Sequence, residues 1–341
     1  MGEGERPILG ITMGDPAGVG PEVTALALAR SEVRALARSV VIGDASVIAD
    51  AVRIVEADLT VRAIGAPNEA DPTTDALWVL DLGNRPVASL ERGRVDPLNG
   101  KAAFEYVERA VTLALTNEID AIVTAPLNKE SLNLAGYPYP GHTEALAHLC
   151  NVSDDDITML LASPRLRVSH VSTHCSMLQA IAAVTRDRVT RVGRLTARAV
   201  APLVTRPPKL ALAGLNPHAG EHGLFGDEDE REIAPAAAAL QAEGIDAHGP
   251  VPPDSVFLRA VNGEFDAVVA MYHDQGLIPV KLLAFEQAVN LTIGLPIIRT
   301  SVDHGTAFDI AGSGKARPDN MVVAIELAAG MGRDRRAVRG V

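Results

Sequence analysis

The stretch from residue 266 to residue 320, DAVVAMYHDQGLIPVKLLAFEQAVNLTIGLPIIRTSVDHGTAFDIAGSGKARPDN, indicates the kind of fold that the chain adopts. It begins with an apolar run at 266–271 without polar alternation, which is typical of a strand buried on both faces of a parallel sheet. Four polar residues follow at once: Tyr272, His273, Asp274 and Gln275. Open α/β sheets bind ligands outside the carboxyl ends of their strands, so this position predicts a functional site.

The rest of this stretch places more polar groups between apolar segments. Lys281 comes first, an apolar run at 289–293 contains Asn290, and Arg299 follows. The stretch closes with a glycine-rich turn at 303–312. A packed domain does not need this density of polar groups, whereas an active site does.

The whole sequence repeats the alternation of strand and helix patterns. Its 341 residues exceed the size at which a single core stops growing, so two domains are expected. The clearest apolar runs, which predict strands, fall at 7–13, 39–43, 77–81 and 120–124. The clearest helical periodicity falls at 100–116. This alternation predicts parallel sheets connected by helices.

Two segments depart from the alternation. Runs at 158–161 and 167–171 are separated by a Ser-Pro turn, which predicts a hairpin. The segment 249–257 contains Pro252, Pro253 and Asp254 and is interpreted as a loop.

Composition excludes several classes of protein. The formal net charge of −12 argues against non-specific binding of nucleic acid, which depends on Lys and Arg neutralising phosphates. The only cysteines are Cys150 and Cys175, so a disulfide framework is excluded and a reducing cytoplasm is expected. We see neither a signal-peptide pattern nor an apolar run of about 18 residues that could span a membrane.

The segment 14–22, GDPAGVGPE, joins the first apolar run to a helix. It resembles a phosphate-binding loop, but its spacing is not G-x-G-x-x-G, and no Lys-Ser/Thr pair ends it as in a P-loop. It is either a tight turn that needs glycine for backbone reasons or a direct ligand contact. The sequence leaves both interpretations open.

Three histidines occupy equivalent positions, each just after an apolar strand: His174, His218 and His273. Neutral imidazole is the commonest metal ligand in proteins, and three ligands with open positions are typical of a catalytic divalent ion. The alternative is three unrelated polar residues at strand ends. His170 is expected to face the core, and His222 lies in a flexible glycine loop that does not fix its direction. Cys175 could bind a soft metal, but in an extended segment its neighbour His174 points the other way.

Lys281, Asn290 and Arg299 form a second set within a net-acidic chain. Arg offers a bidentate fork for carboxylate or phosphate, so this set predicts a site that binds an anionic substrate. The alternative is that Lys281 and Arg299 are solvated surface charges. Their apolar surroundings argue against it, because an unpaired buried charge is costly.

With these residues in view, the chain resembles the 4-hydroxythreonine-4-phosphate dehydrogenase family almost from end to end. The motifs that carry the resemblance are GDPAGVGPE at 14–22, NG at 99–100, TAPLNK at 124–129, GHTE at 141–144, THCS at 173–176, LNPHAGE at 215–221, GP at 249–250, YHDQGLIPVK at 272–281 and HGTAFDIAG at 304–312. The family includes relatives that act on threonate or erythronate 4-phosphate and on dihydrodiol dicarboxylates. The segment 175–178 differs from the Leu-Pro-Leu pattern of the vitamin B6 enzyme, so the substrate stays open.

The resemblance implies a fold of two α/β/α domains, like that of isocitrate and isopropylmalate dehydrogenases, with mixed, mostly parallel sheets. The first domain would comprise 1–132 plus 290–341 with the NAD loop, and the second 133–289 with the metal site and the dimer interface. The active site would lie in the cleft between them and would be completed by the partner in a homodimer.

The resemblance also implies roles for individual residues. The metal ligands would be His174, His218 and His273, for Zn, Mg, Co or Mn. The substrate would contact His142, Thr143, Lys281, Asn290 and Arg299. NAD, or NADP in its place, would contact His304, Gly305, Thr306 and Asp309. Asp254, Asp274 and Lys281 are the candidates for proton transfer.

The implied activity is oxidation of the hydroxyl of a small anionic hydroxy acid, with a 4-phosphorylated acid as the expected substrate, and decarboxylation of the 3-oxo product, as in pyridoxine biosynthesis. A different class of function, acyl or phosphoryl transfer without metal or NAD, would also suit an α/β fold. A metabolite-binding protein without catalysis is the third alternative, although every predicted ligand and clamp residue is present.

Overall fold

The computed structural model describes residues 6–71, 73–284 and 287–339, which form two compact units. Unit 1 comprises Met1–Asn151 and Leu295–Val341, and unit 2 comprises Val152–Gly294. The division differs from the predicted boundaries after residues 132 and 289. Residues 133–151 belong to unit 1 because the short helices in and before this segment pack on the long helix α4 (Pro97–Leu115).

The strands of unit 1 lie in the order β3-β4-β2-β1-β5-β12, and every neighbouring pair is parallel. Their bounds are Thr60–Ile64, Ala76–Asp81, Arg38–Gly43, Ile8–Thr12, Ala121–Thr124 and Arg299–Ser301, in that order. The apolar runs at 7–13, 39–43, 77–81 and 120–124 therefore correspond to strands, as predicted.

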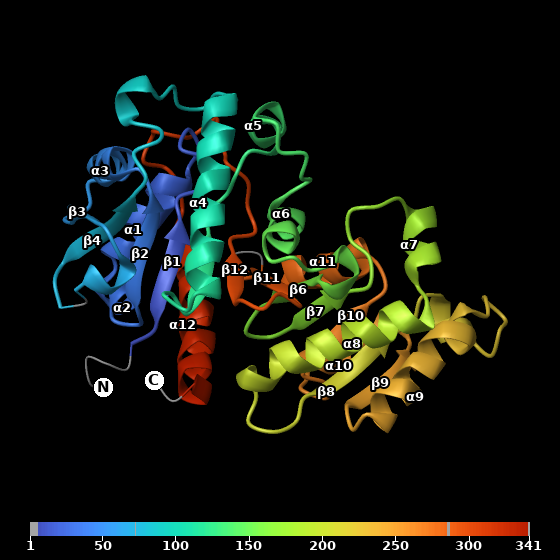
Figure 1. The fold of residues 1–341 in the computed structure, drawn as a ribbon. Helices are drawn as coiled ribbons and strands as arrows, with labels where there is room; N and C mark the ends of the chain where they lie inside the picture. Colours follow the sequence, from blue (N-terminus) through green and yellow to red (C-terminus); the bar gives the residue numbers. More distant parts are fainter. Residues whose placement is uncertain (1–5, 72, 285–286, 340–341) are drawn as a thin grey trace. The chain divides into compact units, whose positions relative to one another are not determined.

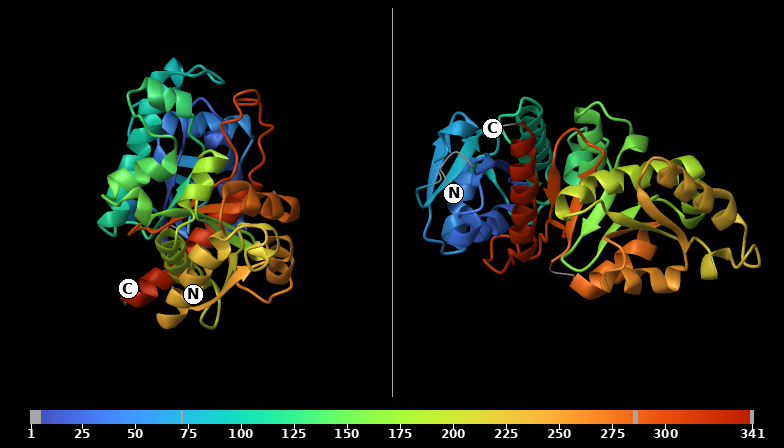
Figure 2. Two further views of the ribbon diagram at one scale, coloured as in Figure 1. Left: turned by 90° about the vertical axis from the view of Figure 1, so that its right-hand side faces the viewer. Right: turned by 90° about the horizontal axis from the view of Figure 1, so that it is seen from below.

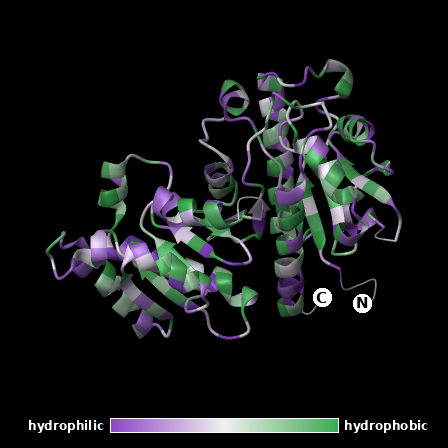
Figure 3. Cartoon of the chain, turned by 180° about the vertical axis from the view of Figure 1, so that it is seen from behind, coloured by the Kyte–Doolittle hydropathy of each residue, from purple (hydrophilic) through white to green (hydrophobic). Residues whose placement is uncertain are grey.

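Helices pack on these strands and cover the core of unit 1 (Figures 1 and 2). They are α1 (Gly20–Ala29), α2 (Ser31–Arg34), α3 (Ala45–Ile54), α4, α5 (Lys129–Leu134), α6 (His142–Leu149) and α12 (Asp319–Arg339), with 3₁₀ turns at Pro67–Glu69 and Val87–Ser89. α4 contacts β1, β2 and β5, and α12 contacts β1, β5 and β12. Apolar and polar bands alternate along α12 in Figure 3, as expected for a helix with one face on a core.

The strands of unit 2 lie in the order β11-β6-β7-β10-β8-β9. Their bounds are Val289–Ile293, Thr158–Ala162, Arg167–His170, Ala267–Ala270, Lys209–Ala213 and Asp246–Val251, in that order. β6 runs antiparallel to both β11 and β7, and the remaining pairs are parallel. The predicted hairpin and the mixed, mostly parallel α/β fold are thus confirmed.

The helices of unit 2 are α7 (Met177–Ala183), α8 (Arg186–Val200), α9 (Ala234–Ala242), α10 (Pro253–Val261) and α11 (His273–Ala284). Shorter turns lie at Asp154–Asp156, Ala201–Leu203, Pro217–Gly220 and Asp229–Ile233. No helix in the described part of the chain is both long and apolar enough to cross a membrane.

The prediction of a loop at 249–257 is wrong. β9 continues to Val251 and α10 begins at Pro253. β9 lies at the end of the strand order, where proline is tolerated because an edge strand can leave one side of its backbone unpaired. Pro253 occupies the first position of α10, where the missing N–H costs no helical hydrogen bond.

Candidate functional site

Two of the predicted metal ligands lie together in unit 2. β7 and β10 are adjacent and parallel, so the residues that follow them emerge at the same edge of the sheet. His174 follows β7, and His273 is the first residue of α11 after β10. Their ring centroids are 5.5 Å apart, and both rings line a hollow of about 580 Å³ together with Cys175, Tyr272 and Asp274.

The orientation of His273 is set by its neighbour. Nδ1 of His273 lies 2.7 Å from Oδ1 of Asp274, which is a hydrogen bond when Nδ1 carries the proton. That arrangement leaves Nε2 of His273 available as an acceptor or as a metal ligand. Metal-binding histidines in proteins usually donate the second ring N–H to a carboxylate, a backbone carbonyl or water.

His170 lies beneath this pair, inside β7, and is fully buried, as predicted. Its ring centroid is 6.4 Å from that of His273, and burial lowers the pKa of His170 to about 4, so the imidazole is neutral. Helix α11 crosses it at Gly276, where an added Cβ would lie 2.4 Å from Nε2 of His170. Sequence reasoning missed Gly276, which lies within the YHDQGLIPVK motif.

The third predicted ligand, His218, does not line this hollow. It lies in the turn Pro217–Gly220 with a left-handed backbone (φ 54°), and its ring centroid is 6.0 Å from that of Phe225. Among the residues that the structure describes, no three His, Cys, Asp or Glu side chains are placed to hold a metal ion. The three-histidine site therefore stays a prediction, and the structure brings two of its members together.

The turn that carries His218 is anchored by the buried carboxylate of Asp229. The backbone N–H groups of Leu215 and Asn216 donate to Asp229 at 2.8 and 3.1 Å. His222, in the same segment, is almost fully exposed and faces Glu230, so it does not share the hollow. Asp254 is exposed in the first turn of α10, and α10 packs against the turn that holds His218.

The two remaining predicted residues of unit 2 are half-buried. Lys281 lies on α11, and Asn290 lies on β11. Oδ1 of Asn290 is buried and has no hydrogen-bond partner within the described residues. An amide oxygen in that state can accept a hydrogen bond from a ligand hydroxyl.

In unit 1, Arg299 lies at the start of β12 and is 3% exposed. β12 pairs with β5, which brings the guanidinium to Thr124: Nε and Nη2 of Arg299 donate to Oγ1 of Thr124 at 3.1 and 2.7 Å. Burial lowers the pKa of Arg299 to about 9, and the nearby Glu144 opposes that shift. Arg299 is therefore a buried cation at neutral pH and not a solvated surface charge.

His142 is the first residue of α6, beside the same cation. Burial, Arg299 and Lys129 together lower the pKa of His142 well below its usual value of 6.5, so the imidazole is neutral. Nε2 of His142 is buried and has no hydrogen-bond partner in the described structure. Lys129, the last residue of the TAPLNK motif, was not among the predicted site residues.

The loop before His142 is held by stacked rings. Phe104 on α4 stacks on Tyr137 and Tyr139, with ring centroids 3.9 and 5.8 Å apart. Gly141 is the N-cap of α6, so Thr143 lies inside the helix, half-buried, and does not cap it. This position leaves the Thr143 hydroxyl free of a capping role.

The predicted cofactor residues lie on one irregular segment of unit 1. Gly305 and Asp309 are exposed, whereas His304 and Thr306 are half-buried. Nδ1 of His304 lies 2.9 Å from the carbonyl oxygen of Gly305, and Nε2 of His304 is buried without a partner among the described residues. The exposed backbone of Gly305 therefore lies next to the buried Nε2 of His304, which can accept or donate a hydrogen bond.

The GDPAGVGPE segment at 14–22 is buried throughout. The N–H of Val19 donates to the carbonyl oxygen of Thr306 at 3.0 Å, and a Cβ on Gly18 would lie 2.9 Å from Thr306. Burial and these contacts favour the interpretation as a tight turn, which also supports the segment 304–312.

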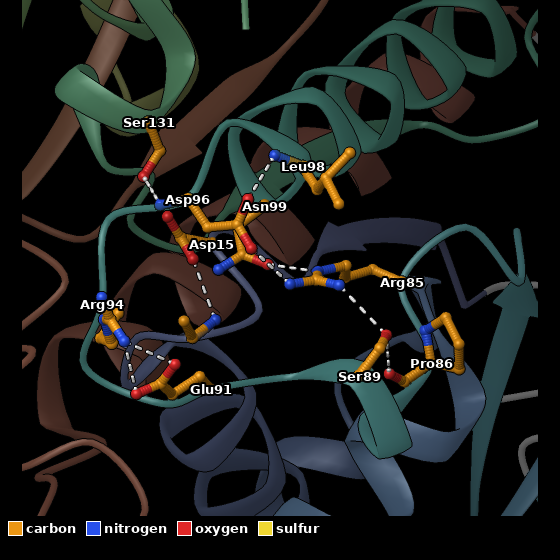
Figure 4. A network of polar contacts seen from close by, with 11 residues as sticks. Asp15, Arg85, Pro86, Ser89, Glu91, Arg94, Asp96, Leu98, Asn99 and Ser131 are labelled. Carbon is orange, nitrogen blue, oxygen red and sulfur yellow. Dashed lines mark hydrogen bonds and ion pairs between the residues drawn. The ribbon is translucent and has the colours of Figure 1, made fainter. Parts of the chain in front are cut away.

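A hydrogen bond within the turn and a polar network beside it lie at the start of this segment (Figure 4). Oδ1 of Asp15 accepts the N–H of Ala17 at 2.9 Å, and burial raises the pKa of Asp15 to about 6. Arg85 donates to Oδ1 of Asn99 at 2.6 Å and to Oδ2 of Asp96 at 2.5 Å. Sequence reasoning missed this network, because the segment 84–96, which is rich in Pro, Gly and Asp, indicates a loop and gives no sign of these hydrogen bonds.

The chain is similar to known proteins over nearly its whole length. Residues 35–328 match the family described as pyridoxal phosphate biosynthetic protein PdxA. The chain is 48% identical over 324 residues to a D-threonate 4-phosphate dehydrogenase from Cupriavidus necator, covering 95% of this chain and 96% of that protein. It is 46% identical over 328 residues to a 4-hydroxythreonine-4-phosphate dehydrogenase from Geobacter metallireducens, covering 96% of each.

Solved structures agree. A 4-hydroxythreonine-4-phosphate dehydrogenase from Burkholderia phymatum has a TM-score of 0.86 and 47% identity, covering 96% of this chain and 98% of that one. A terephthalate 1,2-cis-dihydrodiol dehydrogenase from Burkholderia xenovorans LB400 has a TM-score of 0.70 and 32% identity, covering 95% and 98% of the two chains.

Proposed function

Because the chain belongs to the PdxA family of pyridoxal phosphate biosynthetic proteins, we propose that it is a dehydrogenase for a small 4-phosphorylated hydroxy acid. The enzyme oxidises one hydroxyl with NAD, or NADP in its place, as the hydride acceptor, and the 3-oxo product loses CO₂. The observation that carries the proposal is the buried guanidinium of Arg299 beside the neutral imidazole of His142.

This pair supports an anionic substrate on physical grounds. Burial disfavours the charged form of Arg299. A bound phosphate or carboxylate would stabilise that charged form through direct charge-assisted hydrogen bonds. Nε2 of His142 adds a partner for a substrate hydroxyl or phosphate oxygen. Thr143, Lys281 and Asn290 complete the predicted substrate contacts.

The pair of histidines in unit 2 supports a divalent ion as part of this proposal. His174 and His273 are close, and the Asp274 carboxylate orients His273 with Nε2 available. Together with His218 they form a set of imidazole donors, which suits Zn or Co better than Mg, an ion that prefers oxygen ligands. An ion held there would supply Lewis-acid activation of the substrate hydroxyl.

Three side chains were predicted to handle protons, and their surroundings differ. Asp274 is engaged with His273, so its role is to position that imidazole. Asp254 is exposed and Lys281 is half-buried, and both remain candidates for the base that takes the hydroxyl proton. Conversion of Asp254 to Asn and of Lys281 to Met, compared by the pH dependence of kcat, would distinguish them.

We also propose that the enzyme is a cytoplasmic homodimer with a shared active site. Apolar side chains are exposed on α7 beside His174: Met177 is 55%, Leu178 83% and Ile181 42% exposed. A monomer rarely exposes neighbouring large apolar residues without a partner for them. A second copy of the chain, seated over α7, would cover these side chains and complete the nearby site.

The test is formation of NADH, followed by absorbance, with a divalent ion and a panel of hydroxy acids. Activity on D-threonate 4-phosphate or 4-hydroxythreonine 4-phosphate, and its loss with unphosphorylated analogues, is the expected result. Activity that survives complete chelation would remove the metal from the proposal. Coenzyme A or acetyl-phosphate turnover without NAD would favour the acyl- or phosphoryl-transfer alternative. Oxidation of only a cyclic dihydrodiol dicarboxylate would move the substrate class toward that of the B. xenovorans structure.

A further inference from the structure

The buried carboxylate of Glu22 has no role in the proposed chemistry, yet it reaches the segment proposed to bind NAD. Glu22 lies in the first turn of α1 and is fully buried. Its Oε1 accepts the backbone N–H of Gly312 at 2.8 Å, across 290 positions of sequence. Its Oε2 is buried without a hydrogen-bond partner among the described residues.

Other contacts hold the same segment. At each of them a glycine lets a neighbouring group approach the backbone closely. A Cβ on Gly93 would lie 2.6 Å from the carbonyl oxygen of Phe308. Gly312 has a φ of +82°, and its Cβ would lie 2.6 Å from Cδ of Arg92. Together with the Val19–Thr306 hydrogen bond, these contacts hold the segment at positions 306, 308 and 312.

The side chain of Arg92 is itself held in place, so its contact with Gly312 is rigid. Its Nη2 lies 2.6 Å from Oδ2 of Asp50, and both side chains are largely buried. The side chain is therefore held where it packs under Gly312. Glu22 supplies the opposing contact, the hydrogen bond to the Gly312 N–H.

We propose that Glu22 is a positioning residue that sets the backbone of residues 304–312 and thereby the affinity for NAD. The role rests on the proposed function in assigning NAD to this segment. A carboxylate oxygen is a strong acceptor for a backbone N–H, and the first turn of α1 holds this one against Gly312. A segment that is already ordered loses less conformational entropy when the cofactor binds, so its affinity is higher.

The test uses Glu22→Ala and Glu22→Gln with Asp120→Ala as the matched control. Asp120 is also a buried carboxylate of unit 1 that accepts a backbone N–H at 2.8 Å, but that N–H belongs to Ile8 at the start of β1. Both alanine variants remove a carboxylate that accepts a backbone N–H. Asp120→Ala also removes an ion pair with Arg336 and is the harsher change, but only Glu22→Ala touches the segment 304–312.

The first readout is amide hydrogen exchange of the full chain without cofactor. Glu22→Ala should raise exchange in peptides covering residues 304–314 about tenfold, and Asp120→Ala should not. Glu22→Gln keeps a neutral acceptor and should show a smaller rise in the same peptides. Unchanged exchange in Glu22→Ala, or in Glu22→Gln if the alanine variant does not fold, overturns the proposal. An equal rise in the Asp120 control also overturns it.

The second readout is kinetic. Glu22→Ala should raise KM for NAD about tenfold and leave KM for the hydroxy acid within about twofold. A uniform loss of kcat with both KM values unchanged overturns the effect on affinity. If the wild-type chain does not bind NADH at all, the cofactor assignment of the proposed function fails, while the exchange measurement still decides whether Glu22 positions the segment.

Discussion

Arg299 is the side chain on which the proposed substrate class depends. Arg299→Ala removes a buried cation, so KM for a phosphorylated hydroxy acid should rise on the order of 100-fold, while KM for NAD changes little. Steady-state kinetics with each substrate varied in turn measures both values. Arg336→Ala, which removes a guanidinium paired with Asp120, is the control and should leave both KM values unchanged. An unchanged KM for the acid in Arg299→Ala would remove Arg299 from the substrate site.

Asp15 should make stability depend on pH in an uncommon direction. Burial raises the pKa of Asp15 to about 6 from the ordinary value of 3.8, so the folded state holds this proton more tightly than the unfolded state. By linkage, its contribution to the free energy of unfolding is present below pH 4 and is lost as pH rises to about 6. Asp15→Asn lacks this titration and should gain up to about 3 kcal/mol relative to wild type between pH 4 and pH 7.

Urea unfolding at several pH values measures this difference. Asp71→Asn is the control of opposite sign, because hydrogen bonds from Thr73 lower the pKa of Asp71. That variant should lose stability relative to wild type as pH rises, since the stabilised carboxylate is absent. A pH-independent difference for Asp15→Asn would contradict the raised pKa.

The chemistry of these side chains could be predicted only in part. The apolar surroundings of Arg299 along the sequence predicted that it is not a solvated surface charge, and its burial in the structure agrees. Its binding of an anion stays a proposal. The neutral state of His142 could not be foreseen, because it arises from burial and from two cations that lie far away along the chain or in another motif. The raised pKa of Asp15 could not be foreseen either, because it results from burial in the folded chain.

Gly100 allows helices α4 and α5 to touch. An added Cβ would lie 2.1 Å from the backbone oxygen of Ser131, which is too close for any real contact. Gly100→Ala should therefore lower the free energy of unfolding by about 3 kcal/mol, despite the better helix propensity of alanine. Thermal or urea unfolding measures the change.

Gly330 offers the matched control, because it also lies inside a helix, α12, and an added Cβ there would lie 4.0 Å from the end of the Arg333 side chain. Gly330→Ala should raise stability by about 0.5 to 1 kcal/mol. Equal effects of the two substitutions would show that the contact between α4 and α5 does not constrain Gly100.

Strands and helices with strong local patterns were predicted well. β11 has the predicted bounds, because a run of apolar residues carries its own signal. β9 was missed because Gly249 and Pro250 normally indicate a loop, and their tolerance depends on a place at the sheet edge that only the tertiary fold provides. The pairing of His174 with His273 follows from the adjacency of β7 and β10, whereas the position of His218 depends on a turn with left-handed residues that no periodicity describes.

If the homodimer shares its active site, two inactive variants should complement each other. Arg299→Ala changes unit 1 and His174→Ala changes unit 2, so a mixed dimer would retain one intact site when each site draws these residues from different subunits. Equal mixing after dissociation and reassociation should then restore about a quarter of wild-type activity. Activity assays of the mixture, with each variant alone as control, measure the recovery. No recovery would place both residues in a site built from one chain.

The boundaries of the two units illustrate what the chain's linear order conceals. The resemblance to dehydrogenases suggested that the first unit is built from both ends of the chain, and the structure has that arrangement. Residues 133–151 belong to unit 1 because α5 and α6 pack on α4. No pattern along the sequence indicates these contacts.

This interrupted unit has a consequence during synthesis. The ribosome releases Met1–Asn151 first and Val152–Gly294 next, so β12 and α12 emerge last, after every strand of unit 2. Until then the apolar surfaces of β1 and β5 that α12 covers are open to water and to other nascent chains. A translation product halted at residue 294 should therefore show protected amides in unit 2 and fast exchange in β1 and β5, and protection in both would contradict this order of assembly.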